Sequence, residues 1–129
     1  MPKDHISDFV TRFKNRKKST LVLYNTKKIK QILKVLRDSR LMDYTIIDEN
    51  LKFLTLNIKS TSIKSIEVMS KQSRHEYKSY NDLLTDPRLK QTISFYILTT
   101  SELGWVTSTE ALNNKIGGKV ILWVKLFID

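Results

Sequence analysis

Hydrophobic residues near the N-terminus recur with the period of an α-helix. A stripe at i, i+3, i+4 and i+7 consists of Ile6, Phe9, Val10 and Phe13. This spacing puts the apolar side chains on one face and predicts a helix from about Ile6 to Arg16, capped by Asp4 or Ser7. The same spacing recurs at Ile29, Ile32, Leu33 and Leu36. It predicts a second helix that begins after Thr26 as its N-cap.

From Leu41 onward the hydrophobic period changes from helical to alternating. Leu54, Leu56 and Ile58 predict one face of a strand, and Asp48-Glu49-Asn50 is a predicted turn after a strand at 44–47. With a short strand at 21–24, the first half has the predicted order α-β-α-β-β. Lys59 to Lys64 is rich in Ser, Thr and Lys, which favours a loop between two lobes, residues 1–62 and 63–129.

The second half has mostly β-type patterns. Strands are predicted at 66–69, 74–80 and 93–98, with a basic turn from Ser70 to Arg74. A helical turn is expected at 81–84, and Pro87 blocks its continuation. The predicted fold class is α+β, with an N-terminal α-β-α-β-β lobe and a mostly β C-terminal lobe that contains a short helix.

The stretch from Ile97 to Lys119 gathers the most unusual local chemistry. Three small hydroxyl residues, Thr99-Thr100-Ser101, follow an apolar run and are expected where a buried strand enters a loop. Gly104 permits a tight turn. Thr107 and Glu110 fit a capping box that starts a helix near residue 108. Gly117-Gly118 is predicted to end that helix, and an apolar strand follows from 119 to 127.

The charge balance indicates an anionic partner. The 129 residues contain 23 Lys and Arg against 13 Asp and Glu, a formal net charge of +10. Nucleic acid is the commonest partner for such a body. A membrane surface is disfavoured because the basic residues are spread along the chain. No run approaches the roughly 18 apolar residues of a membrane span. The N-terminal sequence has neither the apolar core of a signal peptide nor the long lead of a transit peptide. The protein is therefore expected to stay where it is made, unless a leader has been removed.

The patterns offer little for catalysis. The chain has no cysteine, which excludes a disulfide framework, a thiolate metal site and a thiol nucleophile. Asp4 and Asp8 could form a carboxylate pair, but acidic residues are expected in a first helical turn. Ser101 lies in no nucleophile elbow, although a triad would be spatial and is left open, and phosphate-binding glycine loops are missing. We therefore predict no enzyme, no cofactor, no metal and no small-molecule substrate.

A hydroxyl-rich loop on a basic body suits RNA better. Small hydroxyls let the protein backbone come close to ribose 2′-OH groups and base edges, while lysine and arginine hold phosphates. Tyr77, Tyr80 and Trp105 could stack on bases or sugars, although an aromatic residue in an amphipathic strand is more often part of a core.

The motifs together resemble a known family. Thr99-Thr100-Ser101, Gly104-Trp105-Val106-Thr107, Glu110-Ala111 and Gly117-Gly118 look like the signature of protein eight of the small ribosomal subunit, the universal family. Upstream, Asp4-His5-Ile6-Ser7-Asp8 with Thr11-Arg12 and Asn15 resembles its opening helix, and Lys27-Lys28-Ile29-Lys30 resembles its second helix. Tyr77-Lys78 lies in the matching hairpin, so the resemblance covers nearly the full chain in the right order.

The resemblance implies a two-lobed α+β protein that binds a distorted helix in the central domain of the small-subunit rRNA and aids its assembly. It also implies contacts to ribosomal proteins five, twelve and seventeen. A translational repressor that binds a messenger mimic of the same site is the alternative. The family resemblance implies these residues for RNA binding: Thr99, Thr100, Ser101, Gly104, Thr107, Gly117, Gly118, Lys119, Tyr77, Lys78, Arg12, Asn15, Lys28 and Lys30.

Several positions depart from the family pattern. Glu102-Leu103 stands where the family has one basic residue, and Lys119 stands where it commonly has Glu. Gln72-Ser73 replaces a Pro-Gly, Thr92 and Ser94 replace glycines, and Lys125 to Asp129 extends past the usual C-terminus. These departures favour an organellar ribosome, expected to be mitochondrial and encoded in the organelle because the motif begins almost at Met1. A plastid or a bacterial cytoplasm is the alternative.

Overall fold

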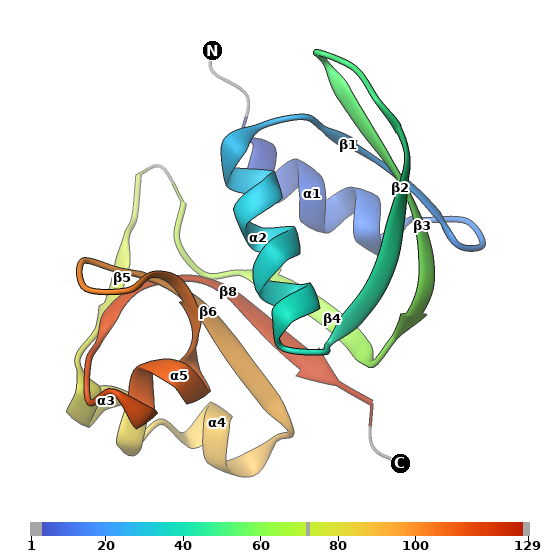
Figure 1. The fold of residues 1–129 in the computed structure, drawn as a ribbon. Helices are drawn as coiled ribbons and strands as arrows, with labels where there is room; N and C mark the ends of the chain where they lie inside the picture. Colours follow the sequence, from blue (N-terminus) through green and yellow to red (C-terminus); the bar gives the residue numbers. More distant parts are fainter. Residues whose placement is uncertain (1–3, 72, 128–129) are drawn as a thin grey trace. The chain divides into compact units, whose positions relative to one another are not determined.

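The computed structural model describes residues 4–71 and 73–127. The chain divides between Ser62 and Ile63 into two compact units (Figure 1). Gln72, in the predicted basic turn, and the last two residues of the predicted C-terminal extension lie outside the described residues. No helix in the described part of the chain is long and apolar enough to cross a membrane.

The first unit is a three-stranded antiparallel sheet with two helices. Its elements are α1 (His5–Lys14), β1 (Thr20–Tyr24), α2 (Lys27–Asp38), β2 (Met42–Glu49) and β3 (Phe53–Thr61). The strand order is β1-β3-β2, so β2 is an edge strand. Helix α1 packs against β1 and α2, and α2 packs against β2 (Figure 1). The predicted order α-β-α-β-β is confirmed.

The hydrophobic stripes build the core of the first unit. Leu21 and Leu23 of β1 pair with Leu56 and Leu54 of β3, and all four are buried. The predicted caps also form, because Asp4 accepts hydrogen bonds from the backbone N–H groups of Ile6 and Ser7 at 3.1 Å, and Thr26 accepts one from Ile29 at 3.2 Å. Burial opposes the charge on Asp4, but these hydrogen bonds outweigh it and lower the pKa of the carboxyl group.

The second unit is a five-stranded antiparallel sheet. Its elements are β4 (Ile63–Val68), β5 (Glu76–Lys78), α3 (Tyr80–Leu84), α4 (Pro87–Gln91), β6 (Ser94–Thr100), β7 (Gly104–Thr107), α5 (Ser108–Asn113) and β8 (Gly118–Leu126). The strand order is β4-β8-β6-β7, and β5 pairs with the beginning of β8. The short helices pack over one face, where the buried cluster is Leu83, Tyr96, Leu98, Val106, Ala111, Val120 and Trp123.

The glycine pair does not end the helix that precedes it. Helix α5 ends at Asn113, Asn114 is its C-cap, and Lys115 takes the left-handed φ of 57°. Glycine is needed at 117 and 118 for space instead. A Cβ at Gly117 would overlap the carbonyl oxygen of Lys78 and lie 2.7 Å from the Cα of Ser79, and a Cβ at Gly118 would overlap the carbonyl oxygen of Thr99. The pair lets β8 enter closely between β5 and β6.

Four other expectations need correction. The predicted strand at 74–80 is shorter, because β5 spans only Glu76–Lys78 and Tyr80 begins α3. The predicted loop at 59–64 is mostly strand, because β3 runs to Thr61 and β4 starts at Ile63. The predicted turn at 48–50 begins later, since β2 continues to Glu49 and the Asn50 side chain accepts hydrogen bonds from the N–H groups of Lys52 and Phe53. Pro87 starts a helix rather than only blocking one, because Asp86 caps α4 and proline suits the first helical position.

We expect Gly117→Ala to lower the free energy of unfolding by about 2–3 kcal/mol, because the new methyl group overlaps backbone that is tied into the β5–β8 pairing. Gly104→Ala is the matched control. Gly104 has open space around it but a φ of 72°, so that change should cost only about 1 kcal/mol. Urea unfolding followed by circular dichroism measures both, and a cost at Gly117 no larger than at Gly104 would contradict the packing argument.

Candidate nucleic-acid interface

The three predicted hydroxyl residues lie at the end of a β-hairpin. Strand β6 ends with Thr99 and Thr100, which pair with Trp105 and Gly104 of β7. Ser101, between these strands, is exposed. The hairpin therefore presents the polar end of an otherwise buried strand, as the sequence predicted.

The three hydroxyl groups of this hairpin differ in their hydrogen bonds. The Thr100 hydroxyl donates to the Gly104 carbonyl at 3.1 Å and accepts from the Leu103 N–H at 2.9 Å, so it holds the turn together. The Ser101 hydroxyl is bonded to the carboxylate of Glu102. The Thr99 hydroxyl makes no hydrogen bond to any other described residue, which leaves it available to a ligand.

Strand pairing brings residues from four strands into one row. Tyr77 of β5 pairs with Lys119 of β8, Lys119 pairs with Thr99 of β6, and Thr99 pairs with Trp105 of β7. Directly paired residues on neighbouring antiparallel strands lie on the same face of the sheet. We call Tyr77, Lys119, Thr99 and Trp105 the cross-strand row. It sets two aromatic rings, one cation and one hydroxyl side by side.

The cross-strand row is open to a ligand at its β5 end. The Tyr77 side chain is 70% exposed, and its ring stacks on that of His75 with 6.3 Å between centroids. Lys119, Thr99 and Trp105 are half-buried. Trp105 is missing from the site residues implied by the resemblance, but its aromatic type and its place after Gly104 were signals in the sequence.

Lys78 is placed differently from its neighbour Tyr77. Successive residues of a strand alternate in face, and the Nζ atom of Lys78 lies 3.1 Å from a carboxylate oxygen of Asp86. Asp86 is only 4% exposed, and it also accepts hydrogen bonds from the Tyr96 hydroxyl at 2.8 Å and the Arg88 N–H at 2.9 Å. Lys78 thus ties β5 to the start of α4.

The Asp86 cluster shifts two titrations. Burial opposes the charge on Asp86, but hydrogen bonds from Tyr96, Lys78 and the Arg88 backbone outweigh it and lower the pKa of the carboxyl group. Burial, together with the hydrogen bond to Asp86, raises the pKa of Tyr96 to about 12. The fold therefore favours the ionised form of Asp86, which is held by Lys78, Tyr96 and the Arg88 backbone.

Two other predicted site residues of the second unit have local roles. Thr107 is buried, with 7% of its surface exposed, and its hydroxyl accepts the N–H of Glu110 at 3.3 Å to cap α5. Its neighbour Ser108 accepts the N–H of Tyr96 at 3.0 Å. The Ser108 bond fixes the start of α5 against β6, and the Thr107 hydroxyl acts within the fold as the cap of α5.

The predicted residues of the first unit fall into two groups. Arg12 is held within the unit, since its Nε atom lies 2.8 Å from Asp8, its Nη1 atom donates to the Val22 carbonyl at 3.1 Å, and its guanidinium lies 4.9 Å from the Tyr24 ring centroid. Lys30 forms an ion pair with Glu49 at 2.7 Å. Asn15 and Lys28 are exposed.

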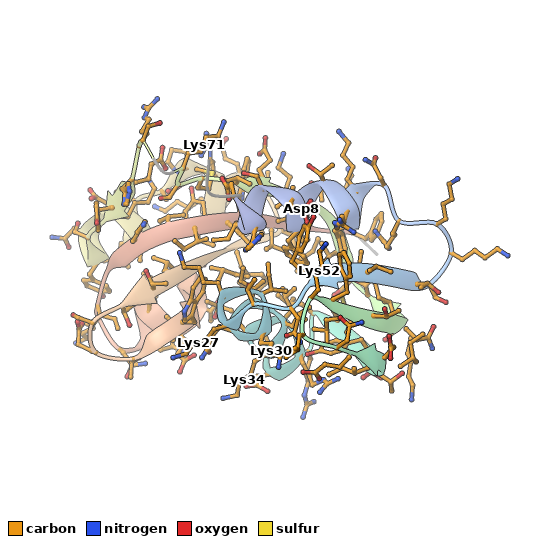
Figure 2. All side chains as sticks on the ribbon, turned by 90° about the horizontal axis from the view of Figure 1, so that it is seen from above. Asp8, Lys27, Lys30, Lys34, Lys52 and Lys71 are labelled. Atoms are coloured by element: carbon orange, nitrogen blue, oxygen red, sulfur yellow. The ribbon has the colours of Figure 1, made fainter. Side chains whose placement is uncertain are left out.

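Helix α2 carries a basic row on its exposed side. Lys27, Lys30 and Lys34 are spaced at i, i+3 and i+7, and Figure 2 shows their side chains projecting to the same side of the helix. All three are exposed. This surface suits phosphate groups better than base edges, because lysine acts on a phosphate as a point charge.

The candidate catalytic carboxylates have structural partners. Both oxygens of Asp4 bond within the first turn of α1, and Asp8 pairs with Arg12. No group of three or more metal-ligating side chains occurs among residues 4–71 and 73–127.

Comparison with known proteins gives one consistent result. The family model described as ribosomal protein S8 matches residues 4–124. The small ribosomal subunit protein uS8 of Persephonella marina is 29% identical, over 94% of this chain and 97% of that protein. The uS8 protein of Bacteroides fragilis is 29% identical over 94% and 98%. The small ribosomal subunit protein uS8c of Tetradesmus obliquus is 29% identical over 94% and 97%.

Replacing Asp86 should give a pH-dependent loss of stability. Its pKa is lowered on folding, so its contribution is complete above the ordinary value of 3.8 and is lost as the pH falls through the lowered pKa. We expect Asp86→Asn to cost about 2 kcal/mol at pH 7, because it leaves the half-buried Lys78 without its charge partner. Below pH 3.8 the difference from the unaltered protein should shrink.

Urea unfolding between pH 7 and pH 2 measures this difference. Asp43→Asn, at an exposed aspartate of β2, is the matched control and should change the free energy of unfolding by less than about 0.5 kcal/mol. A cost for Asp86→Asn that is the same at every pH would show that the carboxylate charge is not what stabilises the cluster.

Proposed function

The chain belongs to the ribosomal protein S8 family, and from this premise we propose that it is a structural component of the small ribosomal subunit. The proposed ligand is a helix of the central domain of the small-subunit rRNA, whose assembly the protein aids. The relatives that it matches over 94% of its length are named as small ribosomal subunit proteins, which supports this proposal.

The observation that carries the proposal is the cross-strand row. Aromatic side chains stack on unpaired bases, a lysine neutralises a phosphate, and a small hydroxyl bonds a ribose 2′-OH or a base edge. Tyr77, Lys119 and Thr99 supply these three functions within one pairing register. Pairing between β5, β8 and β6 holds these three residues in fixed positions. A fixed row of this chemistry suits an irregular RNA helix with displaced bases.

The β6–β7 hairpin extends this surface. We assign Ser101 to a direct hydroxyl contact, and Thr100 and Gly104 to holding the turn that presents it. Gly117 and Gly118 bring β8 close enough to β5 and β6 for the row to be continuous. Glu102 works against the contact, because its carboxylate engages the Ser101 hydroxyl and repels phosphate.

The first unit adds contacts to the RNA backbone. Lys28 and Asn15 are exposed and suited to phosphate and sugar. Lys30 and Arg12 carry internal ion pairs that an RNA phosphate would have to share or displace. The net charge of +10 supports an electrostatic contribution of the RNA phosphates to the binding affinity, and this contribution weakens as the salt concentration rises.

The proposed setting is a mitochondrial ribosome, supported by the departures at Glu102-Leu103 and Lys119 from the family pattern. Ribosomal proteins five, twelve and seventeen are the proposed neighbours. The role is structural, without catalysis or a cofactor. Co-sedimentation of the chain with small subunits from isolated mitochondria is the direct test. Recovery of the chain with cytoplasmic or plastid subunits instead would contradict the mitochondrial assignment.

Two variants should separate the hydroxyl from the cation of the cross-strand row. Thr99→Val removes one hydrogen bond and should weaken binding of the central-domain helix by about fivefold without changing the salt dependence. Lys119→Ala should also weaken binding and reduce the slope of log affinity against log salt by about one. Lys90→Ala, at an exposed lysine of α4, is the control and should change neither.

These affinities can be measured by filter binding between 50 and 300 mM salt. Unchanged binding by both Thr99→Val and Lys119→Ala would remove the cross-strand row from the RNA site. Competition with a messenger RNA of the same shape would in addition show whether the messenger binds at the same site, as the repressor alternative requires.

Altering Glu102 tests whether the hairpin touches the RNA. Glu102→Gln removes the repulsion of phosphate and loosens the hold on Ser101, so the RNA affinity should rise about threefold, while Ser101→Ala should lower it by about fivefold. The same filter-binding assay measures both. Equal affinities for both variants and the unaltered chain would mean that the hairpin lies away from the RNA.

A further inference from the structure

Strand β2 is an edge strand with irregular pairing. It pairs only with β3 among the described strands, and the register shifts twice, once between Asp43 and Tyr44 and once between Ile46 and Asp48. The second shift leaves Ile47 without a directly opposed residue on β3. Near the first shift, the Arg37 side chain bonds the Tyr44 carbonyl at 2.5 Å. The backbone from Thr45 to Glu49 forms the remaining outer edge.

This edge exposes large apolar side chains. Ile46 is 48% exposed and Ile47 is 59% exposed, and Leu51 in the turn that follows is fully exposed. Edge strands of monomeric proteins are usually protected by charge, bulges, proline or a covering element, and β2 has acidic residues and two register shifts of that kind. Ile46, Ile47 and Leu51 nevertheless leave apolar surface exposed along this edge and its turn, which favours burial against a partner.

The same edge is acidic in a basic protein. From Leu41 to Leu51 there is no Lys or Arg, while Asp43, Asp48 and Glu49 all lie on β2. The Lys30 ion pair balances Glu49, but Asp43 and Asp48 are exposed without an ion pair to any other described residue. Arg37 reaches the backbone at Tyr44 and lines the same hollow as Asp43, so the uncompensated charge lies at Asp48, beside Ile46 and Ile47. This charge repels phosphate, which disfavours RNA as the group that covers the two isoleucines.

We propose that the outer edge of β2, from Thr45 to Glu49, binds an extended, basic segment of a neighbouring ribosomal protein as an added antiparallel or parallel strand. The inference rests on the proposed place of the chain in the small subunit. Backbone hydrogen bonds along the edge supply affinity, and side chains supply selectivity. The segment carries Lys or Arg opposite Asp43 and Asp48 and an apolar residue against Ile46 or Ile47.

Charge complementarity selects this occupant over the others. A second copy of the chain would oppose one acidic edge to another, which costs free energy when like charges face each other directly. Proteins that bind rRNA are typically basic and carry Lys- and Arg-rich extensions, so a neighbour in the subunit offers the required chemistry. The turn at Leu51 then gives that segment an apolar contact beyond the end of the strand.

Site-specific photo-crosslinking within assembled small subunits tests the proposal. A benzoylphenylalanine is placed at Ile47, and a second preparation carries it at Ile93, which is 53% exposed on the other unit and serves as the control. We expect Ile47, and not Ile93, to crosslink to a Lys- or Arg-rich peptide of another small-subunit protein, identified by mass spectrometry. Crosslinks from Ile47 to rRNA, to a second copy of this chain, or to nothing would overturn the proposal.

Charge variants in the same crosslinking chain sharpen the result. Asp48→Lys should reduce the Ile47 crosslink to the basic peptide by about five- to tenfold, whereas the conservative Asp48→Glu should leave it within about twofold. Equal yields for both would show that charge does not select the partner. The RNA affinity of the isolated chain should be unchanged in Asp48→Glu, which keeps the net charge.

These outcomes are distinguishable from a failure of the proposed function. A chain that enters the subunit and binds the rRNA helix but gives no protein crosslink from Ile47 refutes only the β2 interface. A chain that does not enter the subunit refutes the proposed function, and the interface falls with it.

Discussion

The distance between three strands of the second unit depends on two residues without side chains. Gly117 and Gly118 let β8 run so close to β5 and β6 that even a methyl group would overlap a backbone carbonyl. Because β8 also pairs with β4, this close approach fixes the middle of the sheet. The register that places Tyr77, Lys119 and Thr99 in one row follows from it. The surface chemistry therefore rests on a backbone constraint that no side chain of the row supplies.

A second device holds the same surface from the opposite face. Tyr77 and Lys78 are neighbours on β5, and alternation sends one toward solvent and the other to the buried carboxylate of Asp86. Asp86 in turn starts α4 and accepts the Tyr96 hydroxyl from β6. A residue that looks like a free cation in the sequence thus orients an exposed aromatic residue. Burial of a carboxylate is tolerated here because three donors surround it.

Local patterns in the sequence were sufficient for most of the fold. The stripes around Phe9 and Leu33 and the cap at Thr26 depend on residues within one helix, so the helices of the first unit were predicted and are confirmed. The role of Gly117 does not follow from local sequence, because its constraint comes from Lys78, which lies 39 positions away in the chain. The family was recognised from motifs, whereas the row that joins Tyr77 to Trp105 depends on strand register and was not visible.

The place of β8 in the chain has a consequence for synthesis. It pairs with β4, β5 and β6, all of which precede it, so each of these strands leaves the translating ribosome before its partner exists. The sheet of the first unit, by contrast, is complete once residue 61 has emerged. Vectorial folding would then finish the N-terminal unit first. The apolar strands of the second unit would stay open to chaperones until the final strand closes the sheet.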